Sequence, residues 1–100
     1  MRRAARVDSN HSDIAKAFKK LGCSFLSLAQ LGKGTPDGVV GYGGLSLLVE
    51  IKSDRGTLNE KQKKFWDTWK GGVRLVRDLD GVLETVETLK KWHKAIGSIR

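Results

Sequence analysis

Apolar residues recur along this chain at two spacings, and each spacing predicts a different kind of element. In the first part of the chain, apolar positions at helical spacing predict a helix that Asn10 caps and that Gly22 ends. The members of this apolar stripe are Ile14, Phe18 and Leu21. Alternation over residues 24–31 then predicts a first strand, because successive side chains of a strand point to opposite faces.

The stretch from Pro36 to Lys52 predicts a β-hairpin. Two apolar runs flank Gly43-Gly44, a pair that suits a tight turn between antiparallel strands. Asp37 opens the first run, and Glu50 and Lys52 close the second. Alternation places Glu50 and Lys52 on the same face of their strand, so pairing of the two runs brings Asp37 toward both.

The remainder of the chain predicts a helix, a strand and a further helix. Asn59 caps the first of these, Gly71-Gly72 ends it, and an apolar stripe marks its inward side. The stripe consists of Leu58, Gln62, Phe65, Trp66 and Trp69. A strand over 73–77, a turn over 78–80 and a helix over 82–96 follow. The order α-β-β-β-α-β-α predicts an α/β fold in which helices flank a mixed β-sheet.

Length and composition limit the class of protein. One hundred residues suit a single domain, here residues 9–100, preceded by a short basic arm over residues 1–8. No uncharged stretch is long enough to cross a bilayer, and no apolar segment follows the basic N-terminus, so we expect an intracellular, cytoplasmic protein. Cys23 is the one cysteine, which excludes an internal disulfide and a cysteine-based zinc site.

An excess of basic residues adds a candidate partner. Nineteen Lys and Arg against eleven Asp and Glu give a formal net charge of +8, which favours nucleic acid first and an acidic membrane surface second. The residues expected to contact DNA phosphates are Lys33, Arg55, Lys61, Lys63, Lys64, Arg2, Arg3 and Arg6. Lys33 lies in the loop 32–36, which either touches phosphate beside the hairpin or is an ordinary connection; it lacks the spacing of a P-loop.

The charges of the hairpin form the strongest candidate for chemistry. Carboxylates such as Asp37 and Glu50 are ligands for hard divalent cations, and Lys52 adds an ammonium group for a nucleophile or a phosphate. The alternative is a surface pair of Glu50 and Lys52, which contributes little to stability. An apolar strand, 47–49, runs directly into these charges, and the cost of placing charges there favours a functional role.

Motifs across most of the chain resemble a known nuclease family. Pro36-Asp37, an apolar strand and Glu50-Ile51-Lys52 match the PD-(D/E)xK pattern of the restriction-endonuclease-like nucleases. Over residues 7–86 the chain more closely resembles the stand-alone VRR-NUC (virus-type replication-repair nuclease) domains, many of them encoded by phages. The further motifs are Gly-x-Gly-x-Pro-Asp at 32–37, Leu58-Asn59-x-x-Gln62 and Trp69-x-Gly-x-Val73.

The resemblance implies a restriction-endonuclease-like core and metal-dependent hydrolysis of DNA. It implies that Asp37, Glu50 and the Ile51 carbonyl bind Mg²⁺ or Mn²⁺. It also implies that Lys52 lies at the attacking water and that Gln62 is an auxiliary site residue. No organic cofactor and no membrane partner is expected.

The expected substrate is branched DNA, such as a Holliday junction, cut by a homodimer in a bacterial or phage-infected cell. Stand-alone members of the family are similar in being dimeric, junction-cutting enzymes. A domain of this size has no separate sequence-reading module, and a two-fold pair of sites suits two symmetric strands. Two alternatives remain: an enzyme that nicks flap or single-stranded DNA, and a catalytically silent, basic DNA-binding domain. The complete set Asp37, Glu50 and Lys52 argues against the silent domain.

Several residues keep two interpretations. Gln62 either contributes to the site or completes a capping box with Asn59, and the two roles are compatible. Asp13 either supplies an acid from the first helix or completes the Asn10 cap; the family more usually carries Glu there. His11 and His93 are interpreted as structural or exposed side chains rather than as general bases. Trp66 and Trp69 are interpreted as core residues rather than as platforms on which bases stack.

Overall fold

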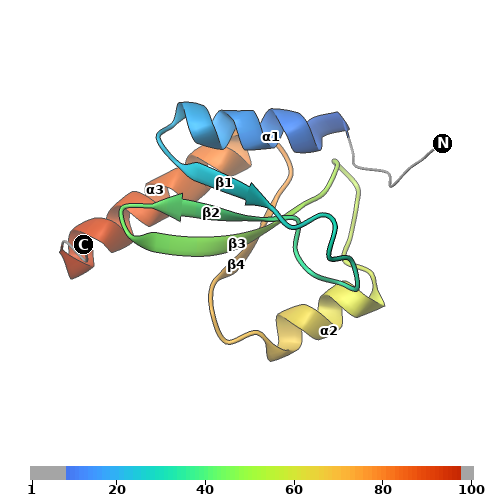
Figure 1. Cartoon of the computed structure of the whole chain (residues 1–100). Helices are drawn as coiled ribbons and strands as arrows, with labels where there is room; N and C mark the ends of the chain where they lie inside the picture. Colours follow the sequence, from blue (N-terminus) through green and yellow to red (C-terminus); the bar gives the residue numbers. More distant parts are fainter. Residues whose placement is uncertain (1–8, 98–100) are drawn as a thin grey trace.

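The computed structural model describes residues 9–97 and has the element order α-β-β-β-α-β-α (Figure 1), which confirms the predicted α/β fold with a mixed sheet and flanking helices. The elements are α1 (Ser9–Lys20), β1 (Ser24–Ser27), β2 (Gly38–Tyr42), β3 (Leu45–Ile51), α2 (Glu60–Thr68), β4 (Val73–Val76) and α3 (Leu79–Ile96). The predicted basic arm, residues 1–8, lies outside the described residues.

The sheet has the strand order β1-β2-β3-β4, with the first three strands antiparallel and β4 parallel to β3. Gly43 and Gly44 form the turn between β2 and β3 at φ values of 55° and 88°, as a tight hairpin turn with two left-handed residues requires. Gly38 pairs with Val49, so the next residues outward, Asp37 and Glu50, lie opposite each other. The predicted hairpin is therefore confirmed, and its register places Asp37 beside Glu50 as the pairing of the two runs led us to expect.

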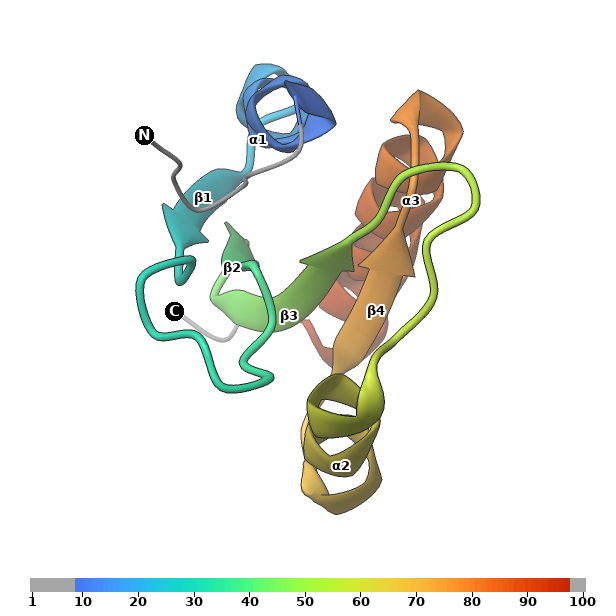
Figure 2. The ribbon, with the colours of Figure 1, turned by 90° about the vertical axis from the view of Figure 1, so that its right-hand side faces the viewer.

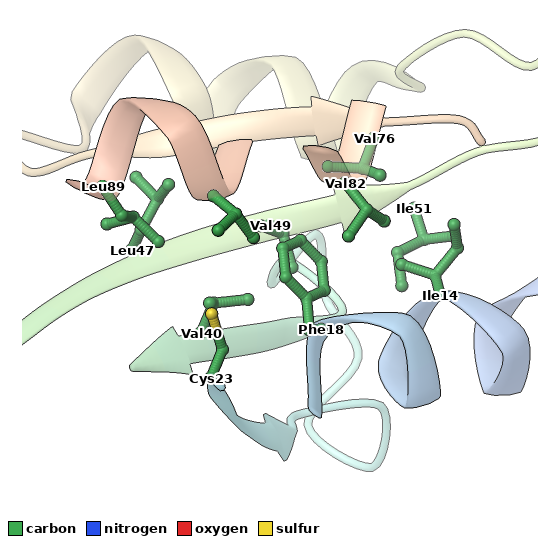
Figure 3. Close-up of a cluster of buried hydrophobic side chains, with 11 residues drawn as sticks. Ile14, Phe18, Cys23, Val40, Leu47, Val49, Ile51, Val76, Val82 and Leu89 are labelled. Carbon is green, nitrogen blue, oxygen red and sulfur yellow. The ribbon is translucent and has the colours of Figure 1, made fainter. Parts of the chain in front are cut away.

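Helices α1 and α3 lie together on one face of the sheet (Figures 1 and 2), and the core lies between them and the strands. Figure 3 shows this cluster, whose members are Ile14, Phe18, Cys23, Val40, Leu47, Val49, Ile51, Val76, Val82, Val86 and Leu89. Because alternate residues of β3 point into this core, the intervening Leu48 and Glu50 point to the opposite face. Cys23 is buried in this core, and burial raises the pKa of its thiol.

Helix α2 lies apart from the other two helices (Figure 2) and none of its residues is buried. Phe65 stacks on Trp69 with ring centroids 5.2 Å apart, yet Trp69 remains 45% exposed and Trp66 is only half-buried. The prediction that these tryptophans join the core was wrong, because the core lies beneath α1 and α3, and α2 lies apart from them (Figure 2).

Three predicted boundaries also differ from the structure. Strand β1 ends at Ser27. The Leu28 N–H still donates to the Asp37 carbonyl at 2.8 Å, and the chain then turns over residues 29–31, where the Leu31 N–H donates to the Leu28 carbonyl at 3.0 Å. Asn10 lies within α1 rather than at its cap, and its side-chain nitrogen donates to the Arg77 carbonyl at 3.3 Å. Asp78 caps α3 by accepting from the Gly81 N–H at 2.9 Å, so that helix begins earlier than predicted.

None of the helices described within residues 9–97 combines the length and the apolar composition that crossing a membrane requires.

Candidate active site

Asp37 is positioned by the register of the hairpin. It directly precedes β2, and its Oδ2 accepts a hydrogen bond of 2.7 Å from the main-chain N–H of Ile51 at the end of β3. This bond fixes the orientation of the carboxylate and leaves the second oxygen, Oδ1, available toward the neighbouring Glu50. Asp37 is half-buried, so water and a ligand reach it.

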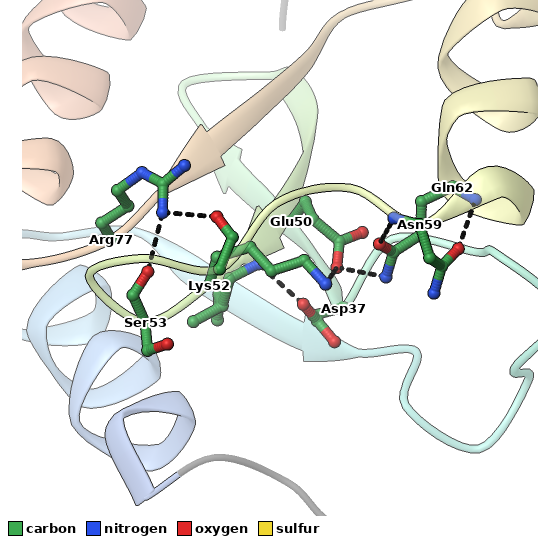
Figure 4. A network of polar contacts seen from close by, with 9 residues as sticks. Asp37, Glu50, Lys52, Ser53, Asn59, Gln62 and Arg77 are labelled. Carbon is green, nitrogen blue, oxygen red and sulfur yellow. Dashed lines mark hydrogen bonds and ion pairs between the residues drawn. The ribbon is translucent and has the colours of Figure 1, made fainter.

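Glu50 is the buried acid of the site, with an exposed fraction of 1%. Its Oε2 accepts a hydrogen bond of 3.0 Å from Gln62 Nε2 and lies 3.9 Å from the Lys52 ammonium nitrogen (Figure 4). Its Oε1 is buried and has no hydrogen-bond partner among the described residues. Burial first, and then the negative charge of Asp37, raise the pKa of Glu50 to about 8, although the Lys52 charge opposes the shift.

Gln62 forms hydrogen bonds both with the cap of α2 and with Glu50. Its main-chain N–H donates to Asn59 Oδ1 at 2.9 Å, and its Oε1 accepts from the Asn59 N–H at 2.9 Å, which is a complete capping box at the start of α2. Because the amide oxygen is engaged there, the amide nitrogen is left to donate to Glu50. The capping role and the site role therefore coexist, as the sequence allowed.

The donor set suits a hard divalent cation. Glu50 Oε1 is a buried carboxyl oxygen that accepts no hydrogen bond from the described residues, and buried polar groups of this kind are costly without a partner. The N–H and C=O of one strand residue point to the same side, so the Ile51 carbonyl points, like its N–H, toward Asp37. Residues 9–97 contain no cluster of three or more His, Cys, Asp or Glu side chains. The site is thus a two-carboxylate site with a main-chain oxygen, which Mg²⁺ accepts because it keeps several waters.

Asp13 is not part of this cluster. It is exposed and lines a hollow between α1 and α3, of about 480 Å³, together with Lys16, Lys20, Leu79 and Leu83. The packing of Ile14 and Phe18 into the core fixes the rotation of α1 and turns the Asp13 position away from the hairpin carboxylates. The structure therefore gives no support to a catalytic role for Asp13. The alternative role, in which Asp13 completes a cap formed by Asn10, is not supported either, because Asn10 lies within α1.

The two histidines lie away from the carboxylates. The half-buried ring of His11 meets Phe25 edge-on at a centroid distance of 6.0 Å. His93 on α3 meets Tyr42 edge-on at 5.7 Å and lies against Gly43 of the hairpin turn. Both rings pack against other side chains, in agreement with their structural interpretation.

The basic residues expected to contact DNA fall into two groups. Lys33, Arg55, Lys61, Lys63 and Lys64 are exposed, whereas Arg2, Arg3 and Arg6 lie outside the described residues. Lys63 forms an exposed ion pair with Glu60 at 3.7 Å. Lys33 has a left-handed backbone with φ of 55°, and the adjacent Gly34 packs against the main chain of Lys61, so the loop 32–35 and the start of α2 form one continuous surface.

Arg77 was not identified from the sequence. It follows β4 and donates three hydrogen bonds to the carbonyls of the loop after Lys52. Figure 4 shows its guanidinium beside Ser53. No periodicity or spacing in the sequence signals such a contact, because it joins a strand end to a loop that is distant along the chain. The one available sequence signal is a charged residue directly after an apolar strand.

Comparisons of the chain with protein-family models, with curated proteins and with solved structures found no match.

Proposed function

We propose that this chain is a metal-dependent DNA endonuclease of the VRR-NUC type, within the PD-(D/E)xK nucleases. The observation that carries the proposal is the environment of Glu50: a fully buried carboxylate with one unpartnered oxygen, beside a second carboxylate, an ammonium and an amide. An ionisable group is rarely buried in this way, with a raised pKa and a second carboxyl beside it, unless it binds a cation or takes part in chemistry.

Asp37, Glu50 and the Ile51 carbonyl are the groups that hold Mg²⁺ or Mn²⁺ in this proposal. The chemistry that such an ion supplies is a lowered pKa of water and relief of the negative charge that develops on a phosphate. Lys52 orients the attacking water, or offsets charge on the phosphate, from its position near Glu50. Gln62 positions Glu50 by its hydrogen bond to Oε2, which would leave Oε1 to bind the ion.

The proposed substrate is branched DNA, cut by a homodimer. The formal charge of +8 supports a polyanionic substrate, and the exposed lysines at the start of α2 supply phosphate contacts without sequence reading. The branched substrate and the dimer come from the resemblance to stand-alone VRR-NUC domains. Cutting two symmetric strands suits an assembly with two-fold symmetry.

The decisive experiment compares cleavage of a four-way junction, a flap, a duplex and a single strand, with Mg²⁺ or Mn²⁺ titrated in and the oligomeric state measured in the same buffer. We expect junction cleavage by the wild type, and retained junction binding without cleavage in Asp37→Ala and Glu50→Ala. Asp67→Ala, which removes an exposed carboxylate on α2, is the matched control. Wild-type cleavage by either site variant overturns the proposal. Preference for the flap or single strand selects the nicking enzyme, and metal-independent binding without cleavage of any DNA selects the silent domain.

A further inference from the structure

The turn that follows Lys52 is organised around one arginine nitrogen. Arg77 Nη1 donates to the main-chain carbonyls of Ser53 at 2.7 Å, Asp54 at 3.2 Å and Gly56 at 2.7 Å. The Gly56 N–H closes the turn by donating to the Ser53 carbonyl at 3.1 Å. Figure 4 shows the Arg77 guanidinium beside this segment, residues 53–57, which we call the 53–57 turn.

The orientation of these carbonyls determines where the amides point. In a trans peptide the C=O and the following N–H point in opposite directions. Since the carbonyls of residues 53, 54 and 56 converge on Arg77, the N–H groups of Asp54, Arg55 and Thr57 point away from it. None of these three N–H groups donates to another of the described residues 9–97. Successive outward N–H groups in a turn form a concavity that suits an anion.

The 53–57 turn also touches the candidate active site. Gly56 lies so close to Lys52 that a β-carbon there would be 3.3 Å from both Cβ and Cδ of the lysine. The Lys52 main-chain N–H donates to the Val76 carbonyl at 3.1 Å, one residue before Arg77. Arg77 therefore holds the turn against the stem of the lysine whose ammonium faces Glu50.

We propose that Arg77 is a positioning residue: it holds the 53–57 turn so that its outward amides and the Arg55 side chain bind a DNA backbone phosphate next to Lys52. This proposal rests on the proposed function for its ligand, a nucleic-acid phosphodiester. The site takes phosphate without reading sequence, because amides and guanidinium contact the backbone rather than the bases. Asp54 places a negative charge in the same turn, so removing the Asp54 charge and removing the Arg55 charge should change the DNA affinity in opposite directions.

The direct test is a ¹⁵N-resolved NMR titration of the wild-type protein with a short DNA duplex in buffer without divalent metal. We expect the amide resonances of Asp54, Arg55 and Thr57 to shift with increasing DNA. An absence of shifts at these amides, while those of Lys61 and Lys64 shift, overturns the proposal. The titration measures binding and does not require cleavage. If the turn amides shift and the cleavage assay shows no cutting of any DNA, the phosphate site is supported and the proposed nuclease function is refuted.

Variants of the turn test the opposing effects of the Arg55 and Asp54 charges in the whole 100-residue chain. Arg55 and Asp54 are both exposed, so Arg55→Gln and Asp54→Asn leave the fold intact. We expect Arg55→Gln to weaken duplex affinity about tenfold and Asp54→Asn to strengthen it about threefold, since one removes an attractive and the other a repulsive charge. Equal affinities for the wild type and both variants contradict a phosphate at this turn.

Arg77 itself is tested by rescue. In Arg77→Met we expect KM for DNA to rise about tenfold while kcat changes less, because the turn loses its anchor and the carboxylates remain in place. Arg77→Lys, whose ammonium also donates several hydrogen bonds, restores part of the lost affinity. Circular dichroism and thermal melting verify that both variants fold. A folded Arg77→Met with unchanged KM, or with a loss confined to kcat, refutes the positioning role.

Discussion

The side-chain amide nitrogen of Gln62 donates a hydrogen bond of 3.0 Å to Oε2 of Glu50. The same amide is fixed at its other end, because its oxygen accepts from the Asn59 N–H in the capping box of α2. The start of a helix thereby sets the orientation of a buried carboxylate in the neighbouring sheet. A helix that contributes almost nothing to the core has a defined role here: it orients Glu50.

Replacing Gln62 separates its two roles. In Gln62→Glu the capping box persists, because a glutamate at this position also accepts from the cap N–H, but the hydrogen-bond donor to Glu50 is lost. Because the new carboxylate also lies beside Glu50 and repels its charged form, we expect a small loss of thermal stability at neutral pH, and we expect the cleavage rate to fall about tenfold to a hundredfold. Gln62→Ala loses the side-chain part of the cap as well, at a cost of about 1 kcal/mol. Thermal melting and single-turnover cleavage measure the two effects; an unchanged rate in Gln62→Glu limits Gln62 to capping.

Local signals made the hairpin and its site predictable. Two glycines at the turn and side-chain alternation were enough to place Asp37 opposite Glu50, and the pair Asn59 and Gln62 was recognisable as a capping box. Each of these features depends on residues that are close in sequence or related by one register.

The features that the sequence did not predict depend on packing between segments that are distant along the chain. Whether Asp13 faces the site is decided by the rotation of α1, which the burial of Ile14 and Phe18 sets. The contact of Arg77 with the 53–57 turn joins two loops that carry no pattern of their own. The exposure of α2 was unpredictable from its apolar stripe, because amphipathicity indicates an inward side and not how much surface lies opposite it.

The pH dependence of stability provides a test of the Glu50 environment in the metal-free protein. Its pKa is raised from 4.5 to about 8 in the folded state, so between these values the folded protein retains a proton that the unfolded chain releases. The contribution of Glu50 is therefore fully present at low pH, and the free energy of unfolding falls as the pH rises toward 8. Urea denaturation in a chelating buffer across this range should show the decline in the wild type and a flatter profile in Glu50→Gln. Identical profiles would argue against a buried, protonated Glu50.

Metal binding should stabilise the fold through Asp37. At a Mg²⁺ concentration about ten times its dissociation constant, binding adds about 1.4 kcal/mol, which for a domain of this size raises the melting temperature by about 5–10 °C. Asp37→Asn is the sharpest variant, because its amide oxygen can still accept from the Ile51 N–H while the negative charge is gone. We expect it to fold normally and to lose most of the Mg²⁺-dependent shift, as measured by calorimetry with and without a chelator. A shift of wild-type size in Asp37→Asn would exclude Asp37 as a ligand.

Gly34 determines how the loop that carries Lys33 meets α2. Its φ is +83°, and a β-carbon there would approach the Lys61 carbonyl oxygen to 2.6 Å, so Gly34→Ala combines backbone strain with a main-chain clash. We expect a loss of about 1–2 kcal/mol in unfolding free energy from the left-handed conformation alone, and a larger KM for DNA because the loop separates from the helix. Gly41→Ala is the matched control, since a β-carbon there has ordinary contacts at 3.6 Å with Ser24 and no left-handed backbone. Equal melting temperatures and equal KM values for the two variants would show that the loop adjusts freely and does not depend on its contact with α2.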